Sequence, residues 1–399
     1  MNDDTNISSD NSAGSRFKRA LERYKRDFPE NWRHHVDHPE VSLDSYVKAQ
    51  KIALGQKVAK KRRIYLDTKY WIYCLDALSG KPQRPIHKNI ADKLAAMVQD
   101  GDTICPAHYA LFDEIGRIGR ADRRIEMARL VDWLSGKVTI VPPEIQMQAE
   151  LLFLIKSFSH KKDDLYPALY MIWGPISSIL GRAVPSIPSL PADTRTAFQK
   201  DWCDFLSVFG LEDFFECASN KLPAPNRADF DFCKRQNEGA EAHRRDYKTF
   251  DEVFLIEIHG VLDALRPEIA STFHYLYTAS GGRLSHEDTE IADDDVHVKQ
   301  FCGIIQEAYK QKKLSTRWPS LHIGAGMHAA KRYEQRLYQK GDWLDGLHAQ
   351  AALPYCDVFL TERALGTLIT GKYLGFDKAY ACKVVWRDED VLPALTHGS

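Results

Sequence analysis

Ile64-Tyr65-Leu66-Asp67-Thr68 is the stretch that most strongly indicates how this chain folds. Three apolar residues form a short β-type run, and an acid ends it before an aromatic, helix-like segment. An Asp at such a junction can cap the following helix, or it can serve as a functional group at the carboxyl end of a strand. Both roles require a strand that ends at Leu66.

Strand-like and helix-like segments alternate after this stretch. We expect a helix over residues 86–98, a strand at 103–105, a helix over 109–118, a strand at 138–141 and a helix over 142–158. Such alternation favours parallel strands that are joined by helical crossovers.

The alternation resumes near the C-terminus. Helices are expected over residues 321–337, 344–353 and 363–370, and strands over 357–361 and 382–386. The intervening segment reads as almost wholly helical. We therefore predict an α/β fold in which a parallel sheet flanked by helices is interrupted by a large all-α insertion.

This interpretation divides the chain into six segments. They are a disordered tail over 1–15, an N-terminal helical extension over 16–61, the first half of the α/β domain over 62–158, the helical insertion over 159–317, the second half over 318–392, and a tail over 393–399.

Several features of the insertion can be predicted individually. The apolar run 165–180 is too short for the roughly 20 residues that span a bilayer, so we expect buried helices. Residues 184–191 and 222–246 are expected to be loops, and 285–295 an exposed acidic segment. Thr249, with Glu and an apolar run after it, predicts a capping box.

Composition limits the possible classes of protein. The chain has 399 residues, 44% of them hydrophobic, and a net charge of -1, so a nucleic-acid partner would need local basic patches. Its eight cysteines form no Cys-x-x-Cys pair, which argues against a zinc knuckle or a redox motif. There is no signal-peptide pattern and no P-loop, so we expect a cytoplasmic protein without a membrane partner.

Acidic residues occur at the predicted strand ends and on the neighbouring helices. The candidates for metal binding are Asp67, Glu114, Asp342, Asp345, Asp357 and Glu362. Carboxylates within about 4–6 Å of one another resist joint ionisation unless protons or cations neutralise them. Because oxygen ligands favour hard ions, the expected cofactor is Mg²⁺ or Mn²⁺.

Each acid also has a structural interpretation. Asp67 can act as a helix cap, and Glu114 can be a surface residue with Asp113 as its competitor. Asp342 can be a solvated acid at a helix start. His348, one turn after Asp345, more often packs or forms a single hydrogen bond than acts in catalysis.

These residues resemble the PIN-domain family of nucleases. The opening Ile64-Tyr65-Leu66-Asp67-Thr68 is similar to the start of that domain, and Glu114 lies in a Leu-x-x-Glu-Ile setting after the second strand. Residues 345–362 are similar to the family's third acid on an Ala-rich helix, followed by a strand that ends in Thr and by a fourth acid. The resemblance covers residues 62–158 and 318–392. The added N-terminal extension and large insertion resemble those of longer bacterial PIN-like proteins, some of which act in defence.

The resemblance implies roles for individual residues. Asp67, Glu114, Asp345 and Glu362 would be the catalytic acids, with Thr68 and Thr361 as supporting hydroxyls. Many members carry Asp at the fourth position, which leaves Asp357 and Glu362 as alternatives for the fourth ligand.

Basic residues near Glu114 are the candidates for nucleic-acid contact. They are Arg117, Arg120, Arg123 and Arg124. A solvated helix face is the alternative interpretation of this run.

Together these features predict a metal-dependent endonuclease that hydrolyses phosphodiester bonds, with RNA expected before DNA, as a toxin or antiviral effector. The alternatives are a DNA nuclease, a catalytically silent scaffold, and an effector that a protein partner activates. The insertion is the expected site for a protein regulator or for a second copy of the chain.

Overall fold

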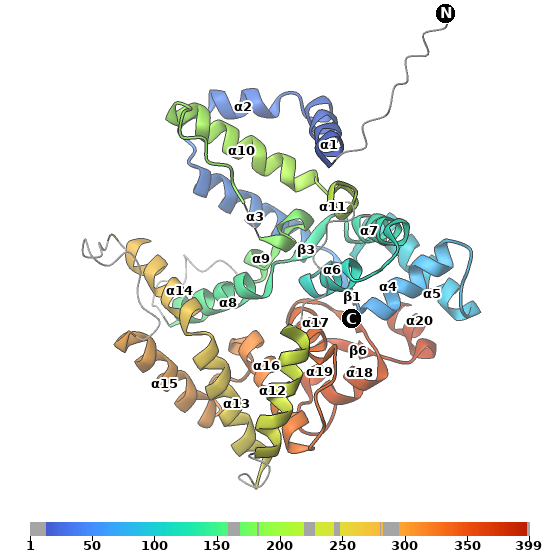
Figure 1. The fold of residues 1–399 in the computed structure, drawn as a ribbon, viewed down its shortest axis with the longest axis vertical. Coiled ribbons are helices and arrows are strands. Elements are labelled where there is room, and N and C mark those ends of the chain that lie inside the picture. The colour runs from blue at the N-terminus through green and yellow to red at the C-terminus, as the bar shows by residue number, and fades with distance from the viewer. Residues whose placement is uncertain are drawn as a thin grey trace, which may run out of the picture.

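A four-stranded parallel sheet lies at the centre of the α/β part of the chain (Figure 1). The computed structural model describes residues 13–158, 168–181, 183–218, 228–242, 248–279, 281 and 295–396. The strands lie in the order β2 (Thr103–Ile104), β1 (Arg62–Leu66), β5 (Val358–Leu360) and β6 (Lys383–Val385). The central strands β1 and β5 come from the two predicted halves, so the helix-rich α/β class and the split sheet are confirmed.

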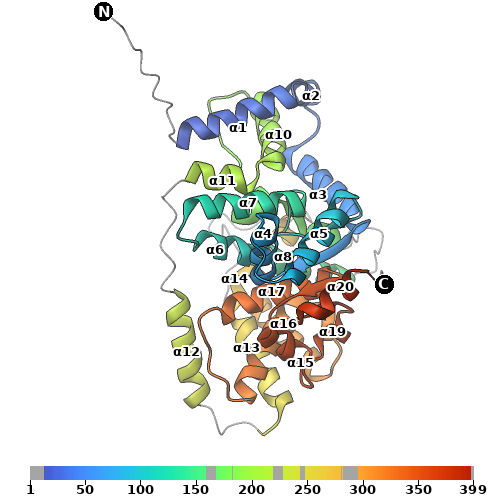
Figure 2. The same cartoon turned by 90° about the vertical axis from the view of Figure 1, so that its right-hand side faces the viewer.

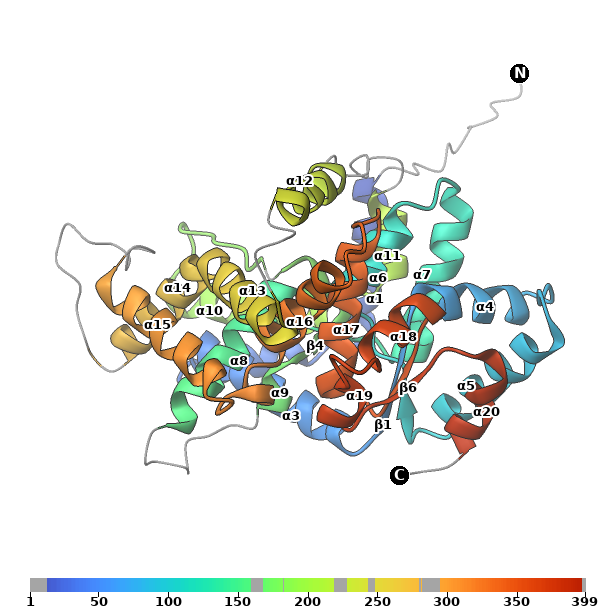
Figure 3. The ribbon, with the colours of Figure 1, turned by 90° about the horizontal axis from the view of Figure 1, so that it is seen from below.

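The register of β1 and β5 sets which of their residues share a face. Ile64 is opposite Val358, Tyr65 opposite Phe359, and Leu66 opposite Leu360. Because side chains alternate along a strand, Ile64 and Leu66 pack on one side of the sheet and Tyr65 on the other. Helices cover both sides, as expected for parallel strands (Figure 3).

One side of the sheet is covered by helices that follow β1 and by the C-terminal helix. They are α4 (Thr68–Leu78), α5 (Pro85–Gln99), α7 (Ala121–Ser135) and α20 (Asp388–Thr396). The other side is covered by helices of the second half. They are α16 (Pro319–Tyr333), α17 (Asp342–Tyr355), α18 (Arg363–Ile369) and α19 (Phe376–Ala379), with η3 (Ser315–Arg317) before them. Helix α20 continues through Thr396, so the predicted C-terminal tail is helical as far as that residue.

The third predicted strand exists at the expected residues, but its pairing was predicted wrongly. Strand β3 (Val138–Ile140) does not join the parallel sheet but pairs antiparallel with β4 (Trp173–Pro175), and an isolated bridge links Thr139 to Ala107. Strand β4 and η2 (Ile176–Leu180) lie in the run that was predicted to form buried helices. A short apolar run is compatible with either structure, and only its pairing with β3 selects the strand.

The insertion does not form one separate body, as Figure 1 shows. Helices α10 (Ala192–Val208) and α11 (Leu211–Ala218) pack with the N-terminal helices α1 (Ala13–Asp27), α2 (Asn31–Asp37) and α3 (Leu43–Ala59). Helices α13 (Phe250–Ala264), α14 (Arg266–Ala279) and α15 (Val296–Lys310) pack instead with α8 (Pro143–Ser157) and α16.

Two predictions for the insertion have different outcomes. The capping box at Thr249 is confirmed, because Thr249 accepts from the backbone of Glu252 and Glu252 accepts from the backbone of Thr249. The loop predicted over 222–246 is wrong in part, since α12 (Ala228–Ala242) lies within it along the edge of the molecule (Figure 2). Most of the predicted acidic segment 285–295 and residues 1–12 lie outside the described residues.

No helix in the described part of the chain combines the length and hydropathy needed to cross a membrane.

Candidate functional site

Asp67 lies where β1 ends and α4 begins. It is at the N-cap position, yet its side chain makes no cap hydrogen bond. Its Oδ2 instead accepts from the Thr361 hydroxyl at 2.8 Å and from the Glu362 backbone N–H at 3.3 Å. Because β1 and β5 are parallel neighbours, their carboxyl ends meet at one sheet edge, which places Asp67 beside Glu362.

Glu114 reaches the same edge from α6 (Tyr109–Gly116), the helix after β2. Its Oε2 accepts from the Thr68 hydroxyl and bonds to His348 Nε2 at 3.1 Å. Burial alone would raise the pKa of Glu114, but the bonds from His348 and Thr68 lower it overall. Its competitor Asp113 pairs with Arg117 at 2.6 Å, so Glu114 is the acid that joins Asp67.

His348 connects this acid to the sheet. It is buried on α17, and its Nδ1 lies 2.8 Å from the Tyr65 hydroxyl. Burial opposes charging of the ring, but Glu114 and the charges of Asp67 and Asp345 raise the pKa of His348. The sequence predicted that His348 packs or forms one hydrogen bond, whereas both of its ring nitrogens have polar partners. Its position one turn after Asp345 was the only signal in the sequence.

Asp345 and Glu362 complete the cluster from α17 and from the N-terminus of α18. Neither carboxylate has a hydrogen-bond or ion-pair partner among the described residues. Burial and the charges of Asp67 and Glu362 raise the pKa of Asp345 to about 7. Burial and Asp67 also raise the pKa of Glu362. These shifts show that negative charge is crowded at this edge.

The two anchored acids share one arrangement. Asp67 and Glu114 are each held through a single oxygen, Oδ2 and Oε2 respectively. Within the described chain, no donor engages Asp67 Oδ1 or Glu114 Oε1. The predicted supports Thr68 and Thr361 therefore fix the direction of both carboxylates and leave one oxygen of each available.

Two predicted ligands do not join the cluster. Asp357 precedes β5 and so lies at the amino edge of the sheet, where it pairs with Arg63 at 2.6 Å. It is removed from the candidate set, which leaves Glu362 as the fourth acid. Asp342 is close enough to influence Asp345 but pairs with Lys331 at 2.5 Å and accepts from the Gln339 backbone at 2.7 Å.

The predicted arginine track is also largely occupied by internal contacts. Arg124 is buried and donates to the Ile118 carbonyl, so it is unavailable to a phosphate. Arg117, Arg120 and Arg123 pair with Asp113, Asp122 and Asp76, respectively.

A lysine that the sequence analysis did not single out lies near Glu362. Lys69 follows Thr68, has a side chain that is 31% exposed, and lowers the pKa of Glu362 against the larger effects of burial and Asp67. Its ammonium lies 3.6 Å from Asp388.

Comparisons with protein-family models, curated proteins and solved structures gave no match for this chain. Its function is therefore inferred from the residues of the site.

The described residues hold two groups that could bind a hard divalent cation, the acids at the sheet edge and a group around Asp204. Among the described residues, the potential ligand atoms of His35, Asp201 and Asp204 lie within 4.8 Å of one another. The acids at the sheet edge are spaced more widely than this. Asp204, however, already binds His35, Asn31, Gln50 and Tyr46, which explains that group as a polar network between α2, α3 and α10. Asp345 and Glu362 have crowded charge without such donors, which is what a cation would relieve.

We expect Asp345→Asn to stabilise the metal-free protein at pH 8 by on the order of 1–3 kcal/mol. The folded pKa of about 7 exceeds the ordinary value of 3.8, so ionisation of Asp345 costs stability. That cost is absent below the ordinary pKa, grows as pH rises, and is complete above the folded pKa. Urea unfolding at pH 8 and pH 5, with EDTA present, measures the difference. Equal stabilisation at both pH values would show that folding does not raise the pKa of Asp345.

Proposed function

We propose that this chain is a metal-dependent PIN-like endonuclease that hydrolyses phosphodiester bonds in RNA. The supporting observation is that Asp67, Glu114, Asp345 and Glu362, from four separate segments, lie near one another at the edge where β1 and β5 end. Clustered carboxylates at the carboxyl edge of a parallel sheet are suited to binding a divalent ion beside a phosphate.

Asp67, Glu114, Asp345 and Glu362 would hold Mg²⁺ or Mn²⁺. When bound, such an ion lowers the pKa of a water nucleophile and offsets the charge on the phosphate. The protein's own contribution is orientation. Thr361 and the Glu362 N–H hold Asp67, while Thr68 and His348 hold Glu114, so that the free oxygens are positioned before a ligand arrives.

Lys69 is the residue that we assign to the approaching phosphate. The acids alone would repel a polyanion, and Lys69 adds positive charge near Glu362. Asp388 holds it only at 3.6 Å, so a phosphate can compete for the ammonium.

The test is cleavage of end-labelled single-stranded RNA and DNA by the purified chain with Mg²⁺ or Mn²⁺. We expect RNA cleavage that EDTA reduces by at least about a hundredfold and that added Mn²⁺ restores. If DNA is cleaved faster than RNA, the preferred substrate is DNA. Cleavage that persists in EDTA, or Mn²⁺ binding without any cleavage of either substrate, would overturn the proposal.

A further inference from the structure

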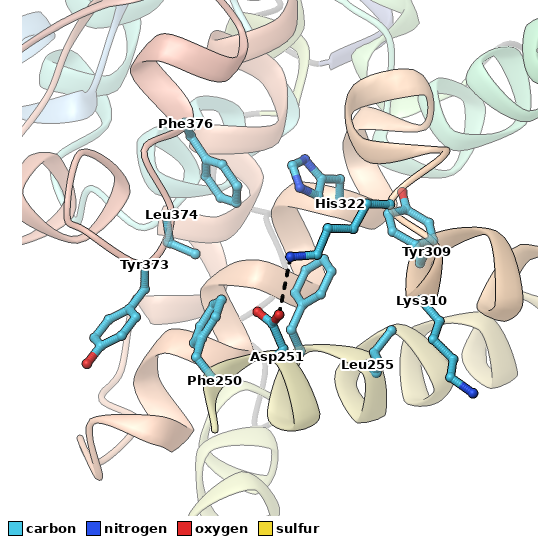
Figure 4. A pocket seen from close by; sticks show the side chains of 11 residues that line it. Phe250, Asp251, Leu255, Tyr309, Lys310, His322, Tyr373, Leu374 and Phe376 are labelled. Carbon is cyan, nitrogen blue, oxygen red and sulfur yellow. Dashed lines mark ion pairs between the residues drawn. The ribbon is translucent and has the colours of Figure 1, made fainter. Parts of the chain in front are cut away.

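A pocket separate from the acidic cluster lies between the insertion and the second half of the α/β domain (Figure 4). Helices α13 and α16, the end of α15 with the residues after it, and the segment around α19 supply its walls. Its cavity volume is about 210 Å³, which is enough to enclose one ring system while the rest of a larger ligand lies outside the cavity.

The walls of this pocket are mostly aromatic. Phe250 and Tyr373 lie nearly parallel, with ring centroids 5.2 Å apart and planes at 23°. Phe254 meets the ring of His322 at 5.7 Å and 90°, and Phe376 lies 5.2 Å from the same ring. The labelled rings in Figure 4 thus come from helices α13, α15, α16 and α19 and from the turn before α19, and they surround one space. Flat, apolar ligands gain most from such walls.

The charged residues around the pocket are mainly lysines. Lys310 and Lys312 line it, and Lys372 lies over the Tyr373 ring at 4.5 Å. Lys310 points away from the cavity in Figure 4 and lies 3.8 Å from Glu307, so of the two lining lysines Lys312 is the nearer to the rings. Asp251, also in the lining, holds Lys312 at 3.4 Å across two exposed side chains, an ion pair that a stronger anion can displace. This balance of charge favours an anionic ligand and disfavours an amine.

His322 supplies a polar group inside the pocket. Its Nδ1 lies 2.8 Å from the Tyr380 hydroxyl, while its Nε2 has no hydrogen-bond partner among the described residues. Burial lowers the pKa of His322 to about 4, so the ring is neutral at pH 7. A neutral imidazole can donate to, or accept from, a ring heteroatom of a ligand without adding charge.

We propose that this pocket binds a nucleoside phosphate, with the base among the aromatic rings beside His322 and the phosphate at Lys312, in the place where Asp251 now pairs with that lysine. The rings match the flat base, the imidazole nitrogen matches its heteroatoms, and the lysine matches a group that carries more than one negative charge. The ligand would contact both the insertion and the segment that follows α18, the helix whose N-terminus carries Glu362. The site does not depend on the nuclease proposal.

Isothermal titration calorimetry of the full chain with AMP, GMP, CMP and UMP tests this inference. EDTA is kept present so that no nucleotide binds through a metal ion at the acidic cluster. We expect at least one nucleotide to bind with a Kd below about 1 mM, and its nucleoside and inorganic phosphate to bind at least about tenfold more weakly. The Asp67→Asn variant should keep the same Kd, because Asp67 is not part of this pocket.

Matched variants locate the binding. Lys312→Glu and Tyr373→Ala should each weaken the nucleotide by at least about tenfold, whereas Lys313→Glu, an exposed neighbour outside the lining, should stay within about twofold. Far-ultraviolet circular dichroism checks that each variant is folded. No binding by any nucleotide, equal binding of the nucleoside, or equal loss in Lys313→Glu would overturn the proposal.

Discussion

Asp67→Asn is expected to reduce RNA cleavage by at least about 10³-fold without unfolding the protein. The amide oxygen of Asn can still accept from the Thr361 hydroxyl and from the Glu362 N–H, so the junction between β1 and α4 is preserved. What is lost is the negative charge at the free oxygen, which a divalent cation requires. Steady-state cleavage of labelled RNA in Mn²⁺ measures the loss.

Glu114 offers a matched pair for the same experiment. Glu114→Gln removes the second anchored carboxylate and should cause a loss of similar size. Asp113→Asn changes its neighbour, which pairs with Arg117 and not with an acid of the cluster, and should retain the rate within about threefold. Calorimetry should show weaker binding of Mn²⁺ by Glu114→Gln and unchanged binding by Asp113→Asn. If Asp113→Asn lowers the rate as much as Glu114→Gln, helix α6 matters for folding rather than for chemistry.

Glu150→Ala is expected to destabilise the fold by about 3–5 kcal/mol. Glu150 is buried on α8 and accepts from the Tyr355 hydroxyl at 2.5 Å, the Ser320 backbone at 2.8 Å and the Ser320 hydroxyl at 2.9 Å. A fourth bond comes from Gln146 at 3.0 Å. Removing the carboxylate leaves these donors buried without an acceptor and opens a cavity. Because Tyr355 ends α17, the network also ties the helix of Asp345 to α8 and α16.

Urea unfolding followed by circular dichroism measures this effect at constant pH. Glu150→Gln is the matched control, because it keeps the volume and one acceptor, and it should cost about 1–2 kcal/mol. If both variants unfold at the wild-type midpoint, the network does not stabilise the fold. If Glu150→Ala is too unstable to purify, a measurable loss in Glu150→Gln still tests the prediction.

The elements with strong local patterns could be predicted from the sequence. Helices α5, α16 and α17 follow an apolar period, and the capping box at Thr249 marks the start of α13. Strand β4 and helix α12 could not, because a short apolar run and a polar segment have no decisive local preference. Their structure depends on neighbours that are distant in the sequence.

The candidate site shows the same division. The sequence by itself determined that acids follow β1 and flank β5, and that hydroxyls stand beside them at Thr68 and Thr361. It could not choose between Asp357 and Glu362, because both are adjacent to the same strand. The parallel register of β1 and β5 decided this, since the two ends of a strand lie at opposite edges of a sheet and only Glu362 lies at the edge of Asp67. The contacts of His348 with Glu114 and Tyr65 likewise exist only after α17 has packed against the sheet, because they join three distant segments.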